Sequence, residues 1–150
     1  MRHKSVIAVL VAIVMALSVI GMVGVTTASK AVASPNYSSS ITKHYLKIGY
    51  GIIKPFRKTI LKTGLGFYIG TVRENGQVYV IEVVPRNSHT SAVTFRDQLI
   101  NGFKRDGYRT YTVDKKGVWT GVKGNEEWSV GAGYSPVTRG YSTTLGYTRI

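Results

Sequence analysis

Three side chains in the sequence are of the types that carry acid–base or metal chemistry: His44, Glu82 and His89. Imidazoles and carboxylates are common metal ligands and common general acids and bases. His89 follows Glu82 by a short segment, whereas His44 would have to reach both from a distant part of the chain. If the three converge, they predict a small secreted hydrolase. The alternative, which we favour, places His44 on the flank of a basic segment and His89 in a solvated loop. It predicts no catalytic residue, metal site or cofactor.

The sequence does not indicate a cysteine site, a paired-carboxylate site or an active site of a known motif. The chain has no cysteine, which excludes thiol catalysis, disulfide bonds and cysteine metal sites. Glu126 and Glu127 are adjacent, so in a strand they would point to opposite faces and could not act as a pair. No phosphate loop, nucleophile elbow, calcium loop or His-Glu-x-x-His helix is present. Binding is therefore a better prediction than catalysis.

A basic amphipathic stretch from Ser40 to Lys62 is the strongest candidate for a binding surface. On a helix its apolar residues fall on one face, and they are Ile41, Tyr45, Ile48, Ile52, Phe56 and Ile60. The opposite face carries Lys43, Lys47, Lys54, Arg57, Lys58 and Lys62. This pattern is typical of segments that bind anionic surfaces. We therefore predict that the six basic residues contact an anionic lipid surface or a wall polymer.

The distribution of charge agrees with this prediction. The chain has 20 Lys and Arg residues against 7 Asp and Glu residues, a net charge of +13. The first acidic residue is Glu74, so the basic stretch carries no compensating carboxylate. A charge this high favours polyanionic partners and says nothing of the fold.

The N-terminus predicts export. A short basic start is followed by the apolar run Val6–Val25 and by the small residues of Ala31-Val32-Ala33. This order is typical of a signal peptide, here residues 1–33. The apolar run is also long enough for an uncleaved membrane anchor, which is the alternative. We expect a secreted or envelope-associated protein.

After the signal segment we expect a polar linker over residues 34–40 and a single small domain over 41–150. For Ile41–Lys62 we favour a helix that is capped by Ser40 and broken between Gly49 and Pro55. The alternative is a strand, because Leu46, Ile48, Tyr50 and Ile52 alternate with smaller or basic residues.

A β-hairpin is predicted around Asn75-Gly76, the strongest short turn signal for two paired strands. With these two residues as the loop, the pairs are Val72 with Tyr79, Gly70 with Ile81, and Tyr68 with Val83. We expect this apolar face to look into the core. The other face, with Thr71, Arg73 and Glu82, should be the more polar one.

The rest of the chain predicts one more helix and four strands. Ser91–Arg105 has an apolar stripe of Ala92, Phe95, Leu99 and Phe103, with Ser91 or Thr90 as cap. The strands are expected at Tyr108–Asp114, Val118–Val122, Glu127–Tyr134 and Tyr141–Ile150. The fold class is therefore α+β. We expect the hairpin and the C-terminal strands to form one antiparallel sheet, covered by one or two helices; a curled sheet is an alternative to an open one.

Aromatic and basic residues alternate in the C-terminal half, where they could stack nucleic-acid bases or sugars. The simpler interpretation is that about half of these rings fill the core, and no nucleic-acid motif supports the alternative. Taken together, the sequence predicts an exported cationic protein that binds an anionic component of a cell envelope. A bacteriocin-like or antimicrobial action is one form of this function.

Overall fold

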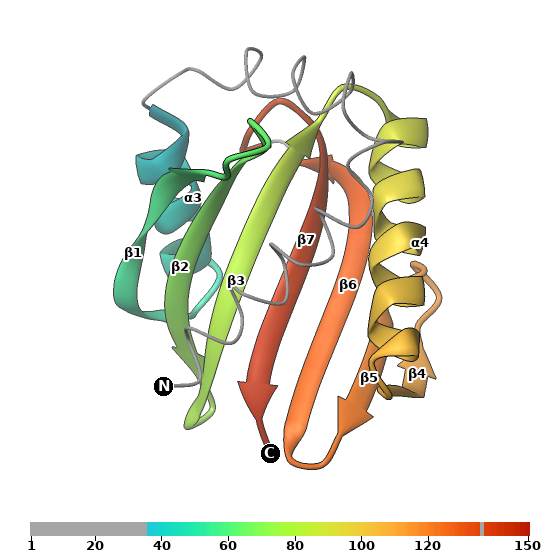
Figure 1. Ribbon diagram of the computed structural model, residues 1–150. Coiled ribbons are helices and arrows are strands. Elements are labelled where there is room, and N and C mark those ends of the chain that lie inside the picture. The colour runs from blue at the N-terminus through green and yellow to red at the C-terminus, as the bar shows by residue number, and fades with distance from the viewer. Residues whose placement is uncertain (1–35, 136) are drawn as a thin grey trace.

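The computed structural model describes residues 36–135 and 137–150, in two helices and seven strands. The predicted signal peptide or anchor, residues 1–33, lies outside the described residues. In chain order the elements are α3 Asn36–Lys47, β1 Gly51–Ile60, β2 Gly66–Glu74, β3 Gln77–Arg86, α4 His89–Arg105, β4 Arg109–Val113, β5 Trp119–Lys123, β6 Glu126–Ser135 and β7 Gly140–Arg149 (Figure 1).

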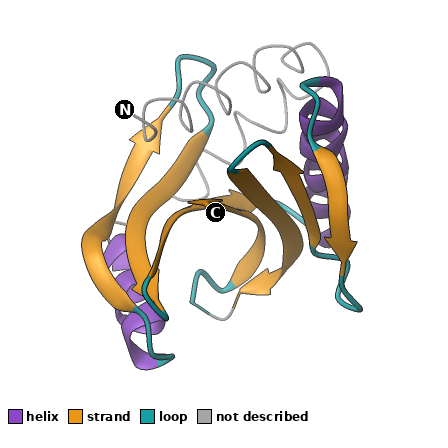
Figure 2. Cartoon of the chain, turned by 90° about the horizontal axis from the view of Figure 1, so that it is seen from below, coloured by secondary structure: helices purple, strands orange, loops and turns teal. Residues whose placement is uncertain are grey.

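The seven strands form one antiparallel sheet in the order β1-β2-β3-β7-β6-β5-β4. The predicted α+β class is confirmed. All five pairs of strands that follow each other directly in the chain are neighbours in the sheet and are joined by short connections. After α4, β4, β5 and β6, strand β7 returns to pair with β3. Seen from below, the sheet is strongly curved, with one helix near each of its ends (Figure 2).

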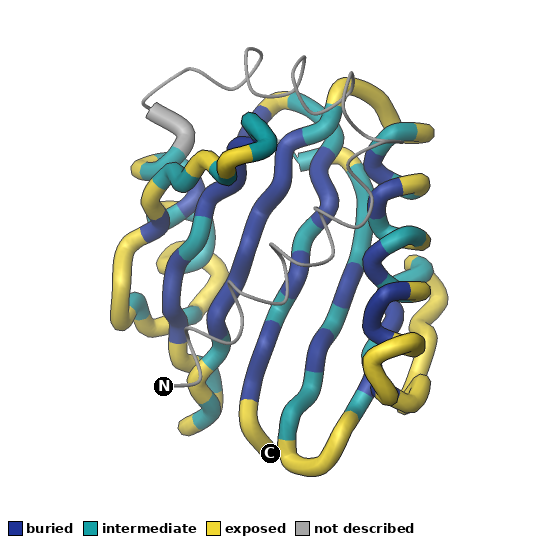
Figure 3. Tube along the Cα trace, viewed as in Figure 1, coloured by how far each residue is buried: buried dark blue, intermediate teal, exposed yellow. Residues whose placement is uncertain are grey.

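The two helices pack on opposite faces of the sheet, and each face has its own core. On the α3 face, Ile41 of the helix packs with Phe56, Tyr68, Val72, Ile81 and Val83. On the α4 face, Phe95, Leu99 and Phe103 of the helix pack with strand residues that include Phe67, Val80, Val84, Trp128 and Leu145. Neighbouring strand residues such as Phe67 and Tyr68 therefore belong to different cores, as the alternation of a strand requires. The central strands are buried along most of their length, and the edge strands β1 and β4 are mainly exposed (Figure 3).

The hairpin of β2 and β3 has the predicted register. Val72 pairs with Tyr79, Gly70 with Ile81, and Tyr68 with Val83. Asn75 and Gly76 both have positive φ, 52° and 77°, as the tight turn requires. The second face does carry Thr71, Arg73 and Glu82, but it is not the solvent-facing side of the hairpin. It meets the larger core, where Thr71 is buried and Glu82 is 0 % exposed.

The favoured single broken helix over Ile41–Lys62 is also wrong in its second half. Helix α3 ends at Lys47, Gly49 adopts a left-handed φ of 102°, and the chain continues as strand β1. Pro55 is tolerated there because an edge strand has one side without ladder hydrogen bonds. The helix also begins at Asn36, so the residues expected as a linker are helical from there on.

Strand β1 is irregular, and the irregularity decides which of its side chains is buried. Its pairing with β2 shifts between Ile52 and Lys54 and again between Lys54 and Arg57. These bulges turn Phe56 into the α3 core, where it is 3 % exposed, and leave Ile60 59 % exposed. The Phe56 ring stacks on the ring of Tyr45, and the backbone N–H of Phe56 donates to Oγ1 of Thr42 at 2.9 Å. Helix α3 and strand β1 are joined by these contacts.

The Phe56 ring requires a glycine beneath it, which predicts a destabilising substitution. A Cβ at Gly70 would lie 2.7 Å from Cδ1 of Phe56. We expect Gly70→Ala to lower the free energy of unfolding by about 1–3 kcal/mol, measured by urea denaturation. Gly51→Ala is the matched control, because its Cβ would come no closer than 3.7 Å to any neighbour. An equal effect of both substitutions would contradict the packing argument.

Helix α4 matches its predicted stripe but begins earlier than expected. Ser88, rather than Ser91 or Thr90, is the cap, and its hydroxyl accepts from the backbone N–H of Ser91 at 3.0 Å. Ala92, Phe95, Leu99 and Phe103 are all buried. The hydroxyl of Thr143 donates to the carbonyl of Ala92 at 2.8 Å, which joins the first turn of the helix to β7. The four predicted C-terminal strands are present, and each of their ends is shifted by one residue.

Candidate functional site

The six basic residues predicted as a binding face lie on two elements that pack together at one edge of the sheet. We call this set the cationic edge: Lys43 and Lys47 of α3, Lys54, Arg57 and Lys58 of β1, and Lys62 in the following turn. All are exposed except Lys58, which is half-buried. Only part of the apolar stripe predicted for the same stretch belongs to the core: Ile41 and Phe56 are buried, whereas Ile48 is 52 % exposed.

The cationic edge surrounds the sheet edge and does not form one flat face. Lys43 and Lys47 belong to helix α3, which packs against β1 and β2 on the α3 face of the sheet. Lys54 and Arg57 instead line a hollow of about 390 Å³ together with Ile69, Thr71 and Val80, and Val80 belongs to the core of the opposite face. The prediction of a single cationic helix face is therefore replaced by positive charge on both sides of an edge strand.

Charged residues on an edge strand also have a structural effect. An edge strand presents unpaired backbone groups, and lysine or proline there discourages pairing with a second chain. Lys54, Pro55 and Arg57 on β1 fit this description. Such protection does not require basic side chains specifically, nor does it explain the two lysines of α3.

The structure does not bring His44, Glu82 and His89 together. His44 is on α3, whereas Glu82 alternates with residues of the α4 core and so lies on the opposite side of the sheet. His89 is exposed at the start of α4, where its ring meets Tyr141 edge-on at 5.6 Å. In the described ranges, no group of three His, Cys, Asp or Glu side chains could hold a metal ion. The hydrolase alternative therefore loses its geometric basis.

Glu82 is nevertheless unusual. It is 0 % exposed, and among the described residues neither of its carboxylate oxygens has a hydrogen-bond partner. Burial of the charged form raises the pKa of Glu82 from 4.5 to about 8. The side chain is therefore largely protonated at neutral pH, and its ionisation at higher pH opposes folding.

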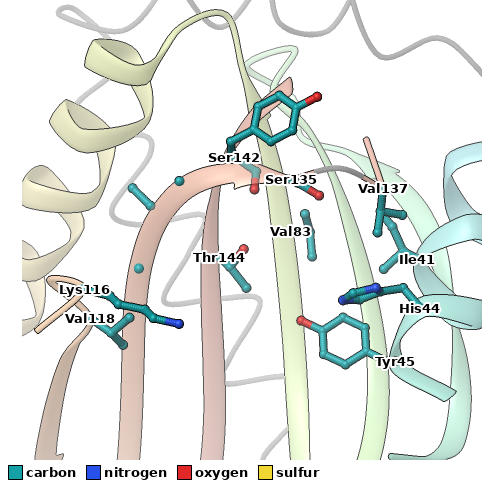
Figure 4. Close-up of a pocket in the computed structure, with 14 residues that line it drawn as sticks. Ile41, His44, Tyr45, Val83, Lys116, Val118, Ser135, Val137, Ser142 and Thr144 are labelled. Atoms are coloured by element: carbon teal, nitrogen blue, oxygen red, sulfur yellow. The ribbon is translucent and has the colours of Figure 1, made fainter. Parts of the chain in front are cut away.

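A groove on the α3 face, which the sequence did not predict, is a second candidate site. It has a volume of about 330 Å³ and lies between α3 on one side and the turn before β5 on the other. Its lining includes His44 and Tyr45 of α3, Lys116 of the turn, and Ser142 and Thr144 of β7. Figure 4 shows His44 and Lys116 pointing into this space from opposite sides.

Two glycines of β6 open the groove. Gly131 pairs with Thr144 and Gly133 with Ser142, so the strand beside the hydroxyl groups has no side chains on the floor. A Cβ at Gly133 would have no heavy atom within 4 Å, whereas one at Gly131 would meet Val118 at 3.0 Å. Because the walls come from three distant segments, no local pattern in the sequence could have indicated the groove.

The walls of the groove are held in place by specific contacts. The Oδ1 atom of Asp114 accepts from the backbone N–H groups of Lys116 and Val118 at 2.8 and 2.9 Å, which fixes the turn that carries Lys116. On the other side, the Tyr45 ring stacks on Phe56 at 5.1 Å and meets Tyr50 edge-on at 5.3 Å. Burial, with a smaller contribution from the Tyr50 phenol, raises the pKa of Tyr45 to about 12. Its hydroxyl, neutral at physiological pH even at the ordinary pKa, becomes still harder to ionise and can donate a hydrogen bond.

The aromatic residues of the C-terminal half divide between core and surface. Tyr108, Trp119, Trp128 and Tyr147 are buried in the α4 core. Tyr111 and Tyr134 are exposed, at 73 % and 60 %. Two exposed rings on different strands do not form the row of stacking platforms that single-stranded nucleic acid uses.

In comparisons with known proteins, no family model, curated protein or solved structure matches this chain. Within the described part of the chain, neither helix has the length and apolar character needed to cross a membrane.

Proposed function

We propose that this protein is an exported binding protein that engages an anionic polymer of the cell envelope through the cationic edge. The observation that carries the proposal is the concentration of six basic side chains at one edge of the sheet, in a stretch without a single acidic residue. Such a cluster produces a local positive potential that raises the rate and strength of polyanion binding.

The arrangement of the charges favours a flexible polymer over a flat membrane. Lys43 and Lys47 belong to the α3 side of the edge, and Lys54 and Arg57 line the hollow that reaches the α4 side. A planar lipid surface would contact one of these groups at a time, whereas a polymer chain can follow the edge and contact both. A wall polymer with repeated phosphate groups has the required charge and flexibility.

Neutralising part of the cationic edge should weaken this binding strongly. The triple variant Lys54→Gln, Arg57→Gln and Lys62→Gln removes three exposed charges. Taking about 1 kcal/mol for each basic residue near an anionic surface, we expect roughly a hundredfold loss of affinity for poly(glycerol phosphate). Affinity of the unaltered protein should also fall steeply between low and physiological salt. Isothermal titration calorimetry at two ionic strengths measures both effects.

A matched control removes the same charge elsewhere. Lys104, Arg105 and Arg109 are exposed, at the end of α4 and the start of β4, on the far edge of the sheet. Their replacement by Gln should change affinity by less than about threefold. Equal losses in the two triple variants would contradict a role for the cationic edge. Stronger binding to phosphatidylglycerol vesicles than to the polymer would show that the target is a membrane.

A further inference from the structure

We propose that the groove on the α3 face is a binding site for a small polyol phosphate, the kind of unit from which a phosphate-containing wall polymer is built. The choice of this ligand rests on the proposed function. The existence of the site, however, is argued from the groove alone and is tested with a small molecule that does not need the cationic edge.

The charge of the groove selects an anion. Lys116 supplies an ammonium group from one wall, and His44 supplies at least one imidazole N–H from the other in any protonation state. None of the described residues that line the groove is acidic. A phosphorylated ligand in the groove would therefore have hydrogen-bond donors in both walls and no repelling carboxylate in the lining.

The remaining polar groups suit the hydroxyl groups of a polyol. Ser142 and Thr144 contribute hydroxyls from successive inward positions of β7, and each hydroxyl both donates and accepts. The Tyr45 hydroxyl, which is neutral at physiological pH, adds a donor at the α3 wall. An entirely apolar ligand would leave these groups without the water that solvates them, which is unfavourable.

The dimensions of the groove agree with a small ligand. Its volume of about 330 Å³ is at the lower end of the range of ligand pockets. The open floor depends on Gly133, where a Cβ would have free space around it. A larger residue at this position would occupy the volume of the ligand without overlapping its neighbours at Cβ.

The test is a titration of the full chain with sn-glycerol 3-phosphate, followed by NMR chemical shifts or calorimetry up to about 10 mM ligand. We expect saturable binding, and binding at least about tenfold weaker for glycerol and for inorganic phosphate, because each has only part of the recognised chemistry. Lys116→Gln should lower the affinity about tenfold, since it removes a charge-assisted hydrogen bond. Gly133→Val should abolish binding by filling the groove.

Lys115 provides the matched control for Lys116. It is the neighbouring residue, it carries the same charge and is exposed, and it does not line the groove. Lys115→Gln should change affinity by less than about twofold. Equal effects at both lysines, unaltered binding in a folded Gly133→Val variant, or the absence of saturable binding would each overturn the inference.

The same variants separate this inference from the proposed function. If the groove does not bind the small ligand but the cationic edge binds polymer, the edge variant alone weakens polymer binding and the inference is overturned. If the edge does not bind polymer but the groove is a true site, sn-glycerol 3-phosphate still binds saturably and Lys116→Gln still weakens it. That second result supports the inference.

Discussion

Replacing Glu82 with glutamine should stabilise this protein by a few kcal/mol at pH 9 and have a much smaller effect at pH 4. The carboxyl group is fully buried and lacks a hydrogen-bond partner among the described residues, and its pKa is raised to about 8 in the folded protein. In the unfolded chain the same group titrates near 4.5, the ordinary value. The folded state therefore holds a proton that the unfolded state releases.

The sign of the effect follows from proton linkage. Below about pH 4.5 the group is protonated in both states and makes no pH-dependent contribution. Between about pH 4.5 and 8 the unfolded state ionises first, so stability falls by up to about 1.4 kcal/mol for each pH unit. Above about pH 8 both states are ionised and the contribution is constant. The total loss can reach about 5 kcal/mol, a large part of the stability of a domain of this size.

Urea denaturation at half-unit intervals from pH 4 to pH 9 measures this profile. Glu82→Gln should flatten the decline between pH 4.5 and 8, because glutamine has a similar shape and does not ionise. Glu127→Gln is the control, since Glu127 is only partly buried, and its profile should follow that of the unaltered protein. Parallel profiles for the unaltered protein and Glu82→Gln would show that the Glu82 carboxylate is solvated or paired in the folded state.

The same residue shows how far the sequence can predict the fold. The hairpin register follows from Asn75-Gly76, because the turn chemistry is local and fixes every pair along both strands. The face of Glu82 does not follow, because β3 is a central strand that is buried on both sides. A charged residue in such a strand has no polar face to occupy. The alternation of side chains along β3 predicted a polar face, but the α4 core covers that face.

The prediction of a helix over Ile41–Lys62 was wrong for a different reason. A spacing of three or four residues between apolar positions continues from α3 into β1, although the helix ends at Lys47. In β1 the spacing comes from two bulges, which bring Phe56 to the α3 core and leave Ile60 exposed. A strand with bulges can imitate a helical period, and only pairing with β2 distinguishes the two. The groove was beyond prediction for the same kind of reason, because its walls meet only in the folded chain.

Truncation of Phe103 should be the most damaging single change in the α4 core. Its ring is 0 % exposed and lies among three other rings, with centroid distances of 5.4 Å to Tyr108, 5.9 Å to Trp119 and 4.8 Å to Trp128. Phe103→Ala removes the ring and leaves a cavity that these neighbours cannot fill, because each is itself held in the core. We expect the free energy of unfolding to fall by about 3–5 kcal/mol, measured by denaturation with urea. Tyr111→Ala removes an aromatic ring from β4 at a position that is 73 % exposed, and it should cost less than about 1 kcal/mol.

The loss of stability in Phe103→Ala should be concentrated at one end of the sheet. Phe103 joins α4 to rings from β5 and β6 and to Tyr108, which lies just before β4. Both tryptophans of the chain contact Phe103, so their fluorescence reports on this region directly. Phe103→Leu keeps most of the apolar volume, and it should give a smaller loss and a folded protein even if the alanine variant unfolds. A red shift in the native emission of the leucine variant, with the α3 core intact by hydrogen exchange, would locate the damage at the α4 end. Equal loss of protection in both cores would instead mean that the two faces unfold as one unit, because β2 and β3 contribute residues to both. In that case the cationic edge and the groove would depend on the α4 core for their stability.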